Sequence, residues 1–512
     1  MVERNLAKVE VASSRLVSRS KNSQQGIFNR TAVIRRVFLN GPFFLPWRDG
    51  RVVMQRPAKP CTSVRFRVPP PIRPSSMSLS PAQEKRFLWV LAGIQFSHIV
   101  DFMVMMPLGP QIMQSFGISA AAFGLLVSSY TYTGAISGLI TASVIDRFDR
   151  RRYLLVVFTG FILASMACGL AQSYAWLVVA RATAGAFGGI MGALIFTISA
   201  DHIPYARRGR ASGIIMSAFS LSTVIGVPLS LTLATQWGWR TPFFAIGAVS
   251  LVLLLLARRE IPQKSQARSV AVSDSGAHGS AAGSRGAAAH DASQPLEPAL
   301  LLRRLGPLRD VLRARHCQIA MGLSMLVLFS SFLLIPYITV HLVYDVGIGL
   351  EQIPLMYLAG GTASFFSARL IGRLADRYGK LKTYRRVAAL SLIPLVWLPN
   401  MGAAPLWLAL ICTTLFFTLV PGRMVAVSAA IVSAAPPNQR ARFMAVNTAA
   451  QQLAMGSAAI LGGLLLTARP EGGFDGMVWV SLASLLATLV GIWWSHRVVL
   501  LGKEQAEHSV AP

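Results

Sequence analysis

Residues 372–380 read Gly372-Arg-Leu-Ala-Asp376-Arg377-Tyr-Gly379-Lys380, and they lie between two apolar runs, 350–371 and 387–399. A degraded copy lies 230 positions earlier, and it reads Ala142-Ser-Val-Ile-Asp146-Arg147-Phe-Asp149-Arg150-Arg151-Arg152. This copy is also flanked by apolar runs. An acidic residue followed by arginines, once per half of the chain, predicts a repeated charged loop between membrane-length helices.

The overall composition supports a membrane protein. The chain has 512 residues, of which 53% are hydrophobic and only 13% are charged, and its mean hydropathy is +0.53. Soluble domains carry roughly a quarter charged residues. Apolar stretches of 18 or more residues recur along the chain, and stretches of that length are typical of transmembrane helices.

The net charge of +29 would indicate nucleic-acid binding in a soluble chain. Here the basic residues cluster in alternate loops, as membrane topology requires, so no nucleic-acid partner is expected. The four cysteines, Cys61, Cys168, Cys317 and Cys412, have no C-x-x-C spacing. We therefore predict no disulfide framework, no metal site and no cofactor.

Residues 1–80 differ from the rest of the chain. They contain 15 lysines and arginines against three acidic residues and include the run Pro69-Pro70-Pro71. Without hydrophobic periodicity, such a segment is typical of a disordered basic tail. Two alternatives stay open, a transit peptide and a chain start misassigned ahead of Met77, just before the first predicted helix.

Twelve apolar spans are predicted, six on each side of a polar segment. They cover residues 87–110, 121–145, 153–171, 176–200, 211–236, 241–257, 318–342, 350–371, 387–399, 405–432, 443–467 and 477–494. Residues 258–298 are rich in Ser, Ala, Gly, Arg and His, which predicts a flexible linker, and 295–315 have the Leu/Arg periodicity of a surface helix. The expected domains are a basic extension at 1–80, a six-helix bundle at 81–257, a linker at 258–316, a second bundle at 317–500 and a tail at 501–512.

The loops with clustered Lys and Arg alternate with loops that carry few charges or none. Because positive residues stay on the cytoplasmic side, both termini and the linker are expected in the cytoplasm. This topology predicts an integral protein of a bacterial-type inner membrane, which we expect to be monomeric.

A second pair of loops supports an internal repeat. Residues 204–211 read Pro204-Tyr-Ala-Arg-Arg208-Gly-Arg210-Ala, and residues 436–443 read Pro436-Pro-Asn-Gln-Arg440-Ala-Arg442-Phe, at an offset of 232. Two landmarks at nearly one offset predict two six-helix bundles of the same design. Parallel repeats of this kind are a transporter plan in which the substrate site lies near the membrane midplane, between the halves.

On these motifs the chain resembles major facilitator superfamily transporters, over roughly residues 82–500. It is most similar to the twelve-helix drug/proton antiporter branch, which includes sugar-efflux permeases. The first motif copy departs from the family pattern, with Ala142 and Asp149 at positions where the family usually has glycine. Arg181-Ala-Thr-Ala-Gly185 resembles an Arg-x-x-Gln-Gly pattern, with Ala184 in place of Gln. The resemblance implies an all-α membrane protein with twelve transmembrane helices in two six-helix pseudo-repeats, the major facilitator fold.

The resemblance also implies a gate. In the family, the motif aspartate faces the N-terminal end of a helix in the other half, where free N–H groups favour an anion. By the repeat, Asp146 is expected near Arg440 and Arg442, and Asp376 near Arg208 and Arg210. The predicted gate comprises Gly372, Asp376, Arg377, Gly379, Asp146, Arg147, Arg150, Arg208, Arg210, Arg440 and Arg442. The alternative is that these arginines only hold their loops on the cytoplasmic side.

Asp101 and His98 lie within the first span, three residues apart and so near one helix face. A carboxylate inside a membrane is costly and marks function by default. We predict that Asp101 binds the coupling proton, with His98 and Arg181 as partners. The alternatives are a structural ion pair for Asp101 and a packing role for His98.

Other polar residues within the spans are candidates for a substrate cavity. Arg423 lies deep in the tenth span, and Tyr337 and Gln95 lie in the seventh and first spans. The alternative for Arg423 is a side chain that reaches the inner membrane face. In the fifth span, Gly226-Val-Pro228 resembles an antiporter signature and predicts a bend, against the alternative of an ordinary proline kink.

These observations predict a secondary transporter and not an enzyme. The small-molecule substrate is expected to leave the cell in exchange for protons, by alternating access. A proton-coupled symporter that imports a metabolite and a membrane receptor that does not transport are the alternatives. The chain has no Gly-x-x-x-x-Gly-Lys-Ser/Thr motif for nucleotide phosphates.

Overall fold

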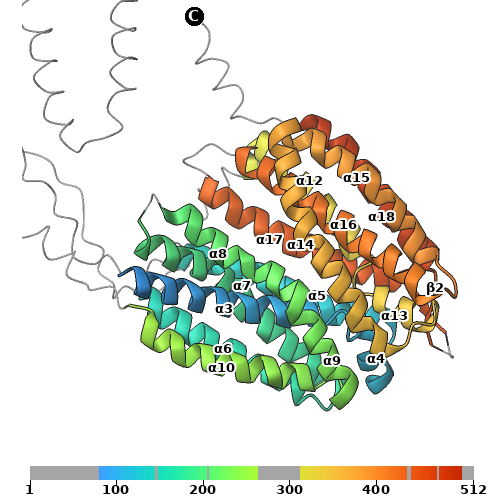
Figure 1. Cartoon of the computed structure of the whole chain (residues 1–512), viewed down its shortest axis with the longest axis horizontal. Coiled ribbons are helices and arrows are strands. Elements are labelled where there is room, and N and C mark those ends of the chain that lie inside the picture. The colour runs from blue at the N-terminus through green and yellow to red at the C-terminus, as the bar shows by residue number, and fades with distance from the viewer. Residues whose placement is uncertain are drawn as a thin grey trace, which may run out of the picture. The chain divides into compact units, whose positions relative to one another are not determined.

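The computed structural model describes residues 80–144, 148–204, 207–262, 312–434, 440–469 and 472–498. They belong to one compact unit, Pro74–Pro512. Almost all of the described chain is helical (Figure 1), which confirms the predicted fold class. The predicted basic extension, the surface helix up to residue 311 and the C-terminal tail lie outside the described residues.

The first half contains the elements that the first six spans predict. In chain order they are α3 (Pro81–Val104), α4 (Gly109–Phe116), α5 (Ala120–Val144), α6 (Arg150–Gly169), α7 (Tyr174–His202), α8 (Arg208–Leu221), the π-helix η3 (Ser222–Gly226), α9 (Val227–Trp237) and α10 (Thr241–Glu260). Side-chain caps begin several of them. Ser80 forms a capping box with Gln83 at the start of α3, and the Asp149 carboxylate accepts the Arg152 N–H at 2.8 Å at the start of α6.

The second half follows the same plan. It contains α12 (Arg315–Phe332), α13 (Ile338–Tyr344), η5 (Leu350–Gln352), α14 (Ile353–Tyr378), α15 (Lys380–Trp397), η6 (Leu398–Asn400), α16 (Leu406–Ala434), α17 (Arg440–Leu464), the strand pair β1 (Thr467–Ala468) and β2 (Phe474–Asp475), α18 (Met477–Trp494) and η7 (Ser495–Arg497). The twelfth span agrees with its prediction at both ends.

Three predicted boundaries are wrong. The first span does not continue to Pro110, because α3 ends at Val104 and α4 begins after a turn that contains Pro107. The seventh span is interrupted at residues 333–337, where Pro336 lacks the N–H that a continuous helix needs. The motif at residues 372–380 was expected in a loop, but α14 continues to Tyr378 and only Gly379 separates it from α15.

Gly379 makes this abrupt connection feasible. Its φ of 92° lies in the region that side-chain-bearing residues rarely adopt. The charged motif residues therefore lie on the last two turns of a long helix.

Eight spans within the described residues are long and apolar enough to cross a membrane. They are Pro81–Val104, Ala120–Thr141, Arg150–Gly169, Tyr174–His202, Arg208–Trp237, Thr241–Glu260, Leu406–Ala434 and Met477–Arg497. The remaining predicted spans correspond to the interrupted helix α12–α13 and to α14, α15 and α17, which carry more polar or charged residues.

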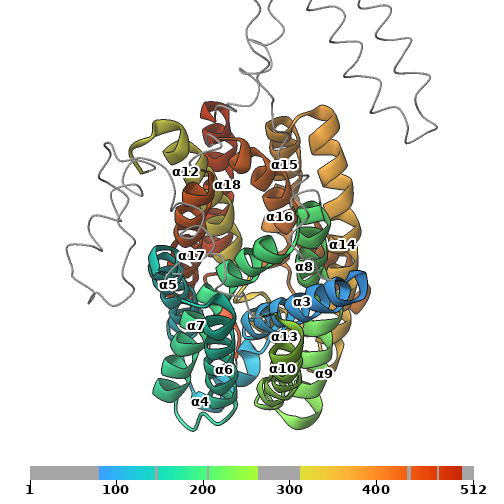
Figure 2. The ribbon, with the colours of Figure 1, turned by 90° about the vertical axis from the view of Figure 1, so that its left-hand side faces the viewer.

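The helix contacts follow the predicted repeat. In the first half, α7 packs against α5 and α6, while α3 packs against α8 and α10. In the second half, α16 packs in the same way against α14 and α15, while α12 packs against α17 and α18. The equivalent neighbours can be followed in Figure 2, and they confirm two six-helix pseudo-repeats.

The two halves meet through equivalent helices. The second helix of one half packs against the fifth helix of the other, which pairs α5 with α17, and α14 with η3 and α9. Backbones approach closely at small residues along both seams. A Cβ added to Gly124 would lie 2.5 Å from the Ala459 carbonyl oxygen, and one added to Gly361 would lie 2.4 Å from that of Thr223.

These close approaches lie toward one end of the bundle, which we call the sealed end. The opposite end, where α14 meets α15, carries the charged motif, and we call it the motif end. At the motif end the side chains of Arg210, Asp376, Arg440 and Arg442 are all exposed. The described halves are therefore in close contact at the sealed end, and their charged side chains are exposed at the motif end.

Candidate functional site

A buried ion pair lies inside the first half. Arg181 of α7 donates from Nη1 to the Asp101 carboxylate of α3 at 2.9 Å, and the two side chains are 1% and 0% exposed. The sequence places these residues at similar depths, and the fold brings them into contact. Charges this deep are stable only when paired and hydrogen-bonded.

Ser165 of α6 completes this cluster. Its hydroxyl donates to the other Asp101 carboxylate oxygen at 2.7 Å. Ser165 was not predicted from the sequence, because a single serine in an apolar run cannot be distinguished from a small packing residue. The guanidinium carbon of Arg181 also lies 4.5 Å from the ring centre of Tyr130, close enough for a cation–π contact.

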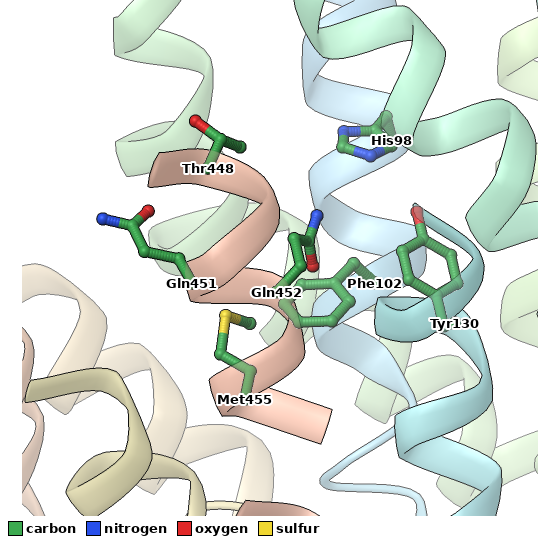
Figure 3. A pocket seen from close by; sticks show the side chains of 7 residues that line it. All are labelled: His98, Phe102, Tyr130, Thr448, Gln451, Gln452 and Met455. Carbon is green, nitrogen blue, oxygen red and sulfur yellow. The ribbon is translucent and has the colours of Figure 1, made fainter. Parts of the chain in front are cut away.

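A cavity of about 160 Å³ lies on the other side of Tyr130, between the two halves. It is lined by His98 and Phe102 of α3, Tyr130 of α5, and Thr448, Gln451, Gln452 and Met455 of α17. Figure 3 shows these side chains coming from both halves, with Gln452 of α17 facing Phe102 and Tyr130. The cavity is therefore bounded by α3, α5 and α17, with the ion pair just behind one wall.

Two buried polar atoms of the lining have no hydrogen-bond partner within the described part of the chain. They are Nδ1 of His98 and the hydroxyl of Tyr130, whose side chain is 2% exposed. Buried polar groups are nearly always satisfied, so orphaned atoms at a cavity call for a partner that comes from outside the protein. His98 thus belongs to the cavity wall, and it does not contact Asp101 through any hydrogen bond among the described residues.

The α17 part of the lining was missed, although its pattern was visible. Thr448, Gln451 and Gln452 recur at a spacing of three and four in an otherwise apolar span, and this spacing places them on one helix face. Gln95, a predicted cavity residue, has an unpartnered buried Oε1 among the described residues but does not line this cavity.

Arg423 of α16 lies elsewhere, buried to 1% exposure within the second half. It donates to the Thr488 hydroxyl at 2.8 Å and to the Ser331 hydroxyl at 2.9 Å, which ties α16 to α18 and α12. Its Nε donates to the Val420 carbonyl at 3.2 Å. In the described residues no carboxylate lies within ion-pair distance of this arginine, and it does not line the cavity.

We expect Arg423→Met to be at least as stable as the native protein. The Ser331 and Thr488 hydroxyls each donate to a carbonyl of their own helix at 2.8 Å. The substitution therefore leaves both hydroxyl donors paired, and each hydroxyl oxygen loses only the hydrogen bond that it accepts from Arg423. It also removes a buried charge that no anion compensates. Thermal unfolding in detergent measures the change. A loss of stability similar to that of an ion-pair variant would contradict this assignment.

Tyr337, another predicted cavity residue, lies at the sealed end. Its hydroxyl donates to the Ala459 carbonyl of α17 and lies 3.4 Å from the Ala120 carbonyl of α5. Gly462 and Gly463 leave space for this side chain, because a Cβ on Gly462 would lie within 3 Å of its ring and one on Gly463 within 3 Å of its hydroxyl. The tyrosine therefore bridges the two halves away from the cavity lining.

Two of the described gate residues, Arg150 and Arg208, have partners within their own half. Arg150 pairs with Asp201, and Arg208 donates to the Ala200 carbonyl at 2.8 Å. Asp376 is exposed and forms no hydrogen bond or ion pair with any described residue. Asp146 and Arg147 lie outside the described residues. The contact of Asp376 with Arg208 and Arg210 stays a prediction, for a state in which the motif end is closed.

The predicted bend of the fifth span has a clear local form. Here η3 is a π-helix, Ser222–Gly226, placed two residues before Pro228. π-Bulges are rare and often accompany functional sites. Gly226 packs against α3, since an added Cβ would lie 2.4 Å from Val100, while α14 approaches the bulge at Thr223. The bulge thus contacts both the helix that carries Asp101 and the other half.

The described residues hold no cluster of three or more His, Cys, Asp or Glu side chains that could bind a metal ion.

The sequence matches a known protein family. Residues 91–422 and 320–509 match the family model of the Major Facilitator Superfamily.

Three curated relatives share part of the sequence. The uncharacterized MFS-type transporter YceJ of Bacillus subtilis (strain 168) is 28% identical over 175 residues, which are 34% of this chain and 45% of the relative. The gallate transporter of Pseudomonas putida is 29% identical over 184 residues, 35% and 41% of the two chains. The multidrug resistance protein Stp of Mycobacterium tuberculosis (strain CDC 1551 / Oshkosh) is 32% identical over 164 residues, 31% and 30%. The matches span less than half the length of each of these relatives.

Solved structures share the fold at low sequence identity. A bacterial homolog of the human lysosomal transporter Spinster, in an inward-facing and occupied conformation, has a TM-score of 0.60 at 14% identity, over 82% of this chain and 97% of that one. A D-xylose–proton symporter also has a TM-score of 0.60, at 16% identity, over 82% and 99%. At this identity the likeness concerns the fold alone.

Proposed function

The chain belongs to the Major Facilitator Superfamily, and from that membership we propose that it is a secondary active transporter, which exports a small organic compound in exchange for protons. The observation that carries the proposal is the Asp101–Arg181 pair, fully buried beside a cavity between the two halves. A receptor or scaffold without transport has no use for charges that cost this much to bury.

Asp101 is the proposed proton carrier. When it is ionised, its charge is balanced by Arg181 and its second oxygen is held by Ser165. Protonation would remove the ion pair and leave Arg181 as an uncompensated cation behind Tyr130. Because an unpaired buried charge is costly, binding of a proton would favour a rearrangement of the cluster that adjoins the cavity.

The seams between the halves support alternating access. The halves touch through two equivalent helix pairs at the sealed end, while Arg210, Arg440, Arg442 and Asp376 are exposed at the motif end. In the proposed cycle the halves rock, the sealed end opens, and Asp376 approaches the start of α8. Charge-assisted contacts there would each contribute ~1–3 kcal/mol to the closed state.

The proposed orientation follows from the basic loops. The motif end carries Arg150, Arg208, Arg377 and Arg440, so the positive-inside rule assigns it to the cytoplasm. Both termini and the linker would then be cytoplasmic, in a bacterial-type inner membrane, and the protein would act as a monomer. In this orientation the cavity would load from the cytoplasm, as an exporter requires.

Export is favoured over import by the antiporter-like Gly226-Val-Pro228 and by the relative named as a multidrug resistance protein. Proton-coupled import is the second candidate, because another relative of similar identity is named as a gallate transporter. The two candidates differ in the direction that a proton gradient drives the substrate.

Inverted membrane vesicles test the proposal. With protons pumped inward, we expect a compound from a labelled panel to accumulate inside the vesicles, and we expect a protonophore to abolish this accumulation. The matched control is a vesicle preparation with the Asp101→Asn variant. If compounds accumulate only in whole cells, driven inward by the gradient, the protein is a symporter and the export proposal is wrong.

A further inference from the structure

We propose that the cavity selects an uncharged compound of about one ring in size that carries hydroxyl or amide groups. This inference rests on the proposed function, because it treats the cavity between the halves as the substrate site. Size, charge, hydrogen-bonding capacity and ring contacts each point to this chemistry.

The volume of the cavity matches a small ligand. The cavity measures about 160 Å³. An engineered protein cavity of about 150 Å³ binds benzene, so this space fits one six-membered ring with a small substituent.

The lining excludes a fixed charge. Within the described residues, no Asp, Glu, Lys or Arg side chain lines the cavity. The nearest ions, Asp101 and Arg181, neutralise each other at 2.9 Å behind Tyr130. A charged ligand would give up its hydration here without meeting an opposite charge, which is unfavourable.

The polar groups of the lining require a ligand that can form hydrogen bonds. The Tyr130 hydroxyl and His98 Nδ1 are buried and lack partners among the described residues. The two side chains are neighbours, since the Tyr130 hydroxyl and the Nε2 edge of the His98 ring both come within 3 Å of a Cβ built on Gly188 of α7. From α17, the amides of Gln451 and Gln452 can both donate and accept. A hydroxyl or an amide can satisfy this set, and a hydrocarbon cannot.

The remaining walls suit a flat ring. Phe102 is tilted against Tyr130, with ring centres 5.3 Å apart, and is stacked on Phe332 of the other half at 6.2 Å. Met455 supplies a polarizable side chain that adapts to the ring edge. An aromatic ring can therefore pack against fixed aromatic surfaces while its substituent reaches the polar atoms.

A matched ligand series tests this inference. Benzyl alcohol, benzamide, benzylamine and benzoate share one ring and differ in charge at pH 7. Binding is measured by saturation-transfer NMR on the full chain in nanodiscs. We expect benzyl alcohol and benzamide to bind at least tenfold more tightly than benzylamine and benzoate. Equal or tighter binding of either ion would overturn the inference, and tight benzoate binding would mean that Arg181 is available to anions.

A pair of tyrosine variants locates the binding. Tyr130→Phe removes the unpartnered hydroxyl and keeps the ring, and we expect it to weaken benzyl alcohol binding about fivefold to tenfold. The control is Tyr132→Phe on the same helix, whose hydroxyl bonds to Ser457 at 3.0 Å outside the lining. Thermal unfolding verifies that both variants fold. Equal effects of the two variants would show that the compound binds elsewhere, against the inference.

Transport separates this inference from the proposed function. If a proton gradient moves a charged member of the series and no uncharged member, the transporter proposal stands and the inference fails. If the uncharged compounds bind at Tyr130 and no gradient moves them in proteoliposomes, the inference about the cavity stands and the proposed coupling fails.

Discussion

Asp101→Asn is expected to abolish proton-driven transport and to destabilise the protein. The substitution removes the only carboxylate paired with Arg181 among the described residues. Removing one partner of a buried ion pair leaves an uncompensated charge and costs about 3–5 kcal/mol in the free energy of unfolding. Transport against a gradient in proteoliposomes and thermal unfolding measure the two effects.

Substrate counterflow distinguishes a proton carrier from a structural ion pair. Exchange of labelled for unlabelled substrate needs the halves to move but needs no net proton movement. We therefore expect Asp101→Asn to retain counterflow while it loses accumulation driven by a pH gradient. Unchanged gradient-driven accumulation in this variant would disprove the role of Asp101.

The double variant Asp101→Asn/Arg181→Gln separates stability from coupling. It removes both charges and leaves two neutral side chains that can hydrogen-bond to each other and to Ser165. Since neutral replacement of a buried pair is often tolerated, we expect most of the lost stability to return. Proton-driven accumulation is not expected to return, because no titratable carboxyl remains in the cluster.

Gly361→Ala is expected to shift the protein toward a state that is open at the sealed end. In the present conformation the added Cβ would lie 2.4 Å from the Thr223 carbonyl oxygen and 2.8 Å from its carbon, both in the backbone of η3. Overpacking of this kind costs ~1–3 kcal/mol. Because separation of the halves relieves the clash, the conformational equilibrium should change about 5- to 150-fold.

Distances between spin labels at the motif end measure this shift. Labels at Ile140 of α5 and Val432 of α16, which are 57% and 37% exposed, report on opposite halves. We expect the population with the shorter distance to grow in Gly361→Ala. The matched control is Gly192→Ala in α7, where an added Cβ meets nothing within 4 Å. The same populations in both variants would mean that this seam does not govern the conformation.

Helix periodicity and loop charge made much of the fold predictable. Strong apolar runs predict the position of α18 at both ends, and the repeated Asp-Arg motif predicts two equivalent halves. The errors lie where a local residue interrupts a run, at Pro107 and Pro336, and where a single glycine replaces an expected loop, at Gly379. Proline and glycine change the backbone at only a few residues, so a hydrophobicity averaged over a whole span does not reveal their effect.

The candidate site was only partly predictable. The cost of burying a charge identifies Asp101, Arg181 and Arg423 from the sequence alone. It does not say which charges meet, and the fold pairs the first two while it surrounds Arg423 with hydroxyls. Tyr130 and Ser165 are ordinary residues in apolar runs, and their roles depend on the neighbours that packing provides.

The charged stretch at residues 372–380 shows what each level of structure determines. The sequence by itself determined the class of the protein, because composition, span length and a motif repeated 230 positions apart are properties of the chain. Only the tertiary structure decided that the motif residues end a long helix away from the cavity lining, and that α3, α5 and α17 line that cavity. The physical reason is that a site between two halves is formed by residues hundreds of positions apart. Their contact depends on how helices pack across the seam.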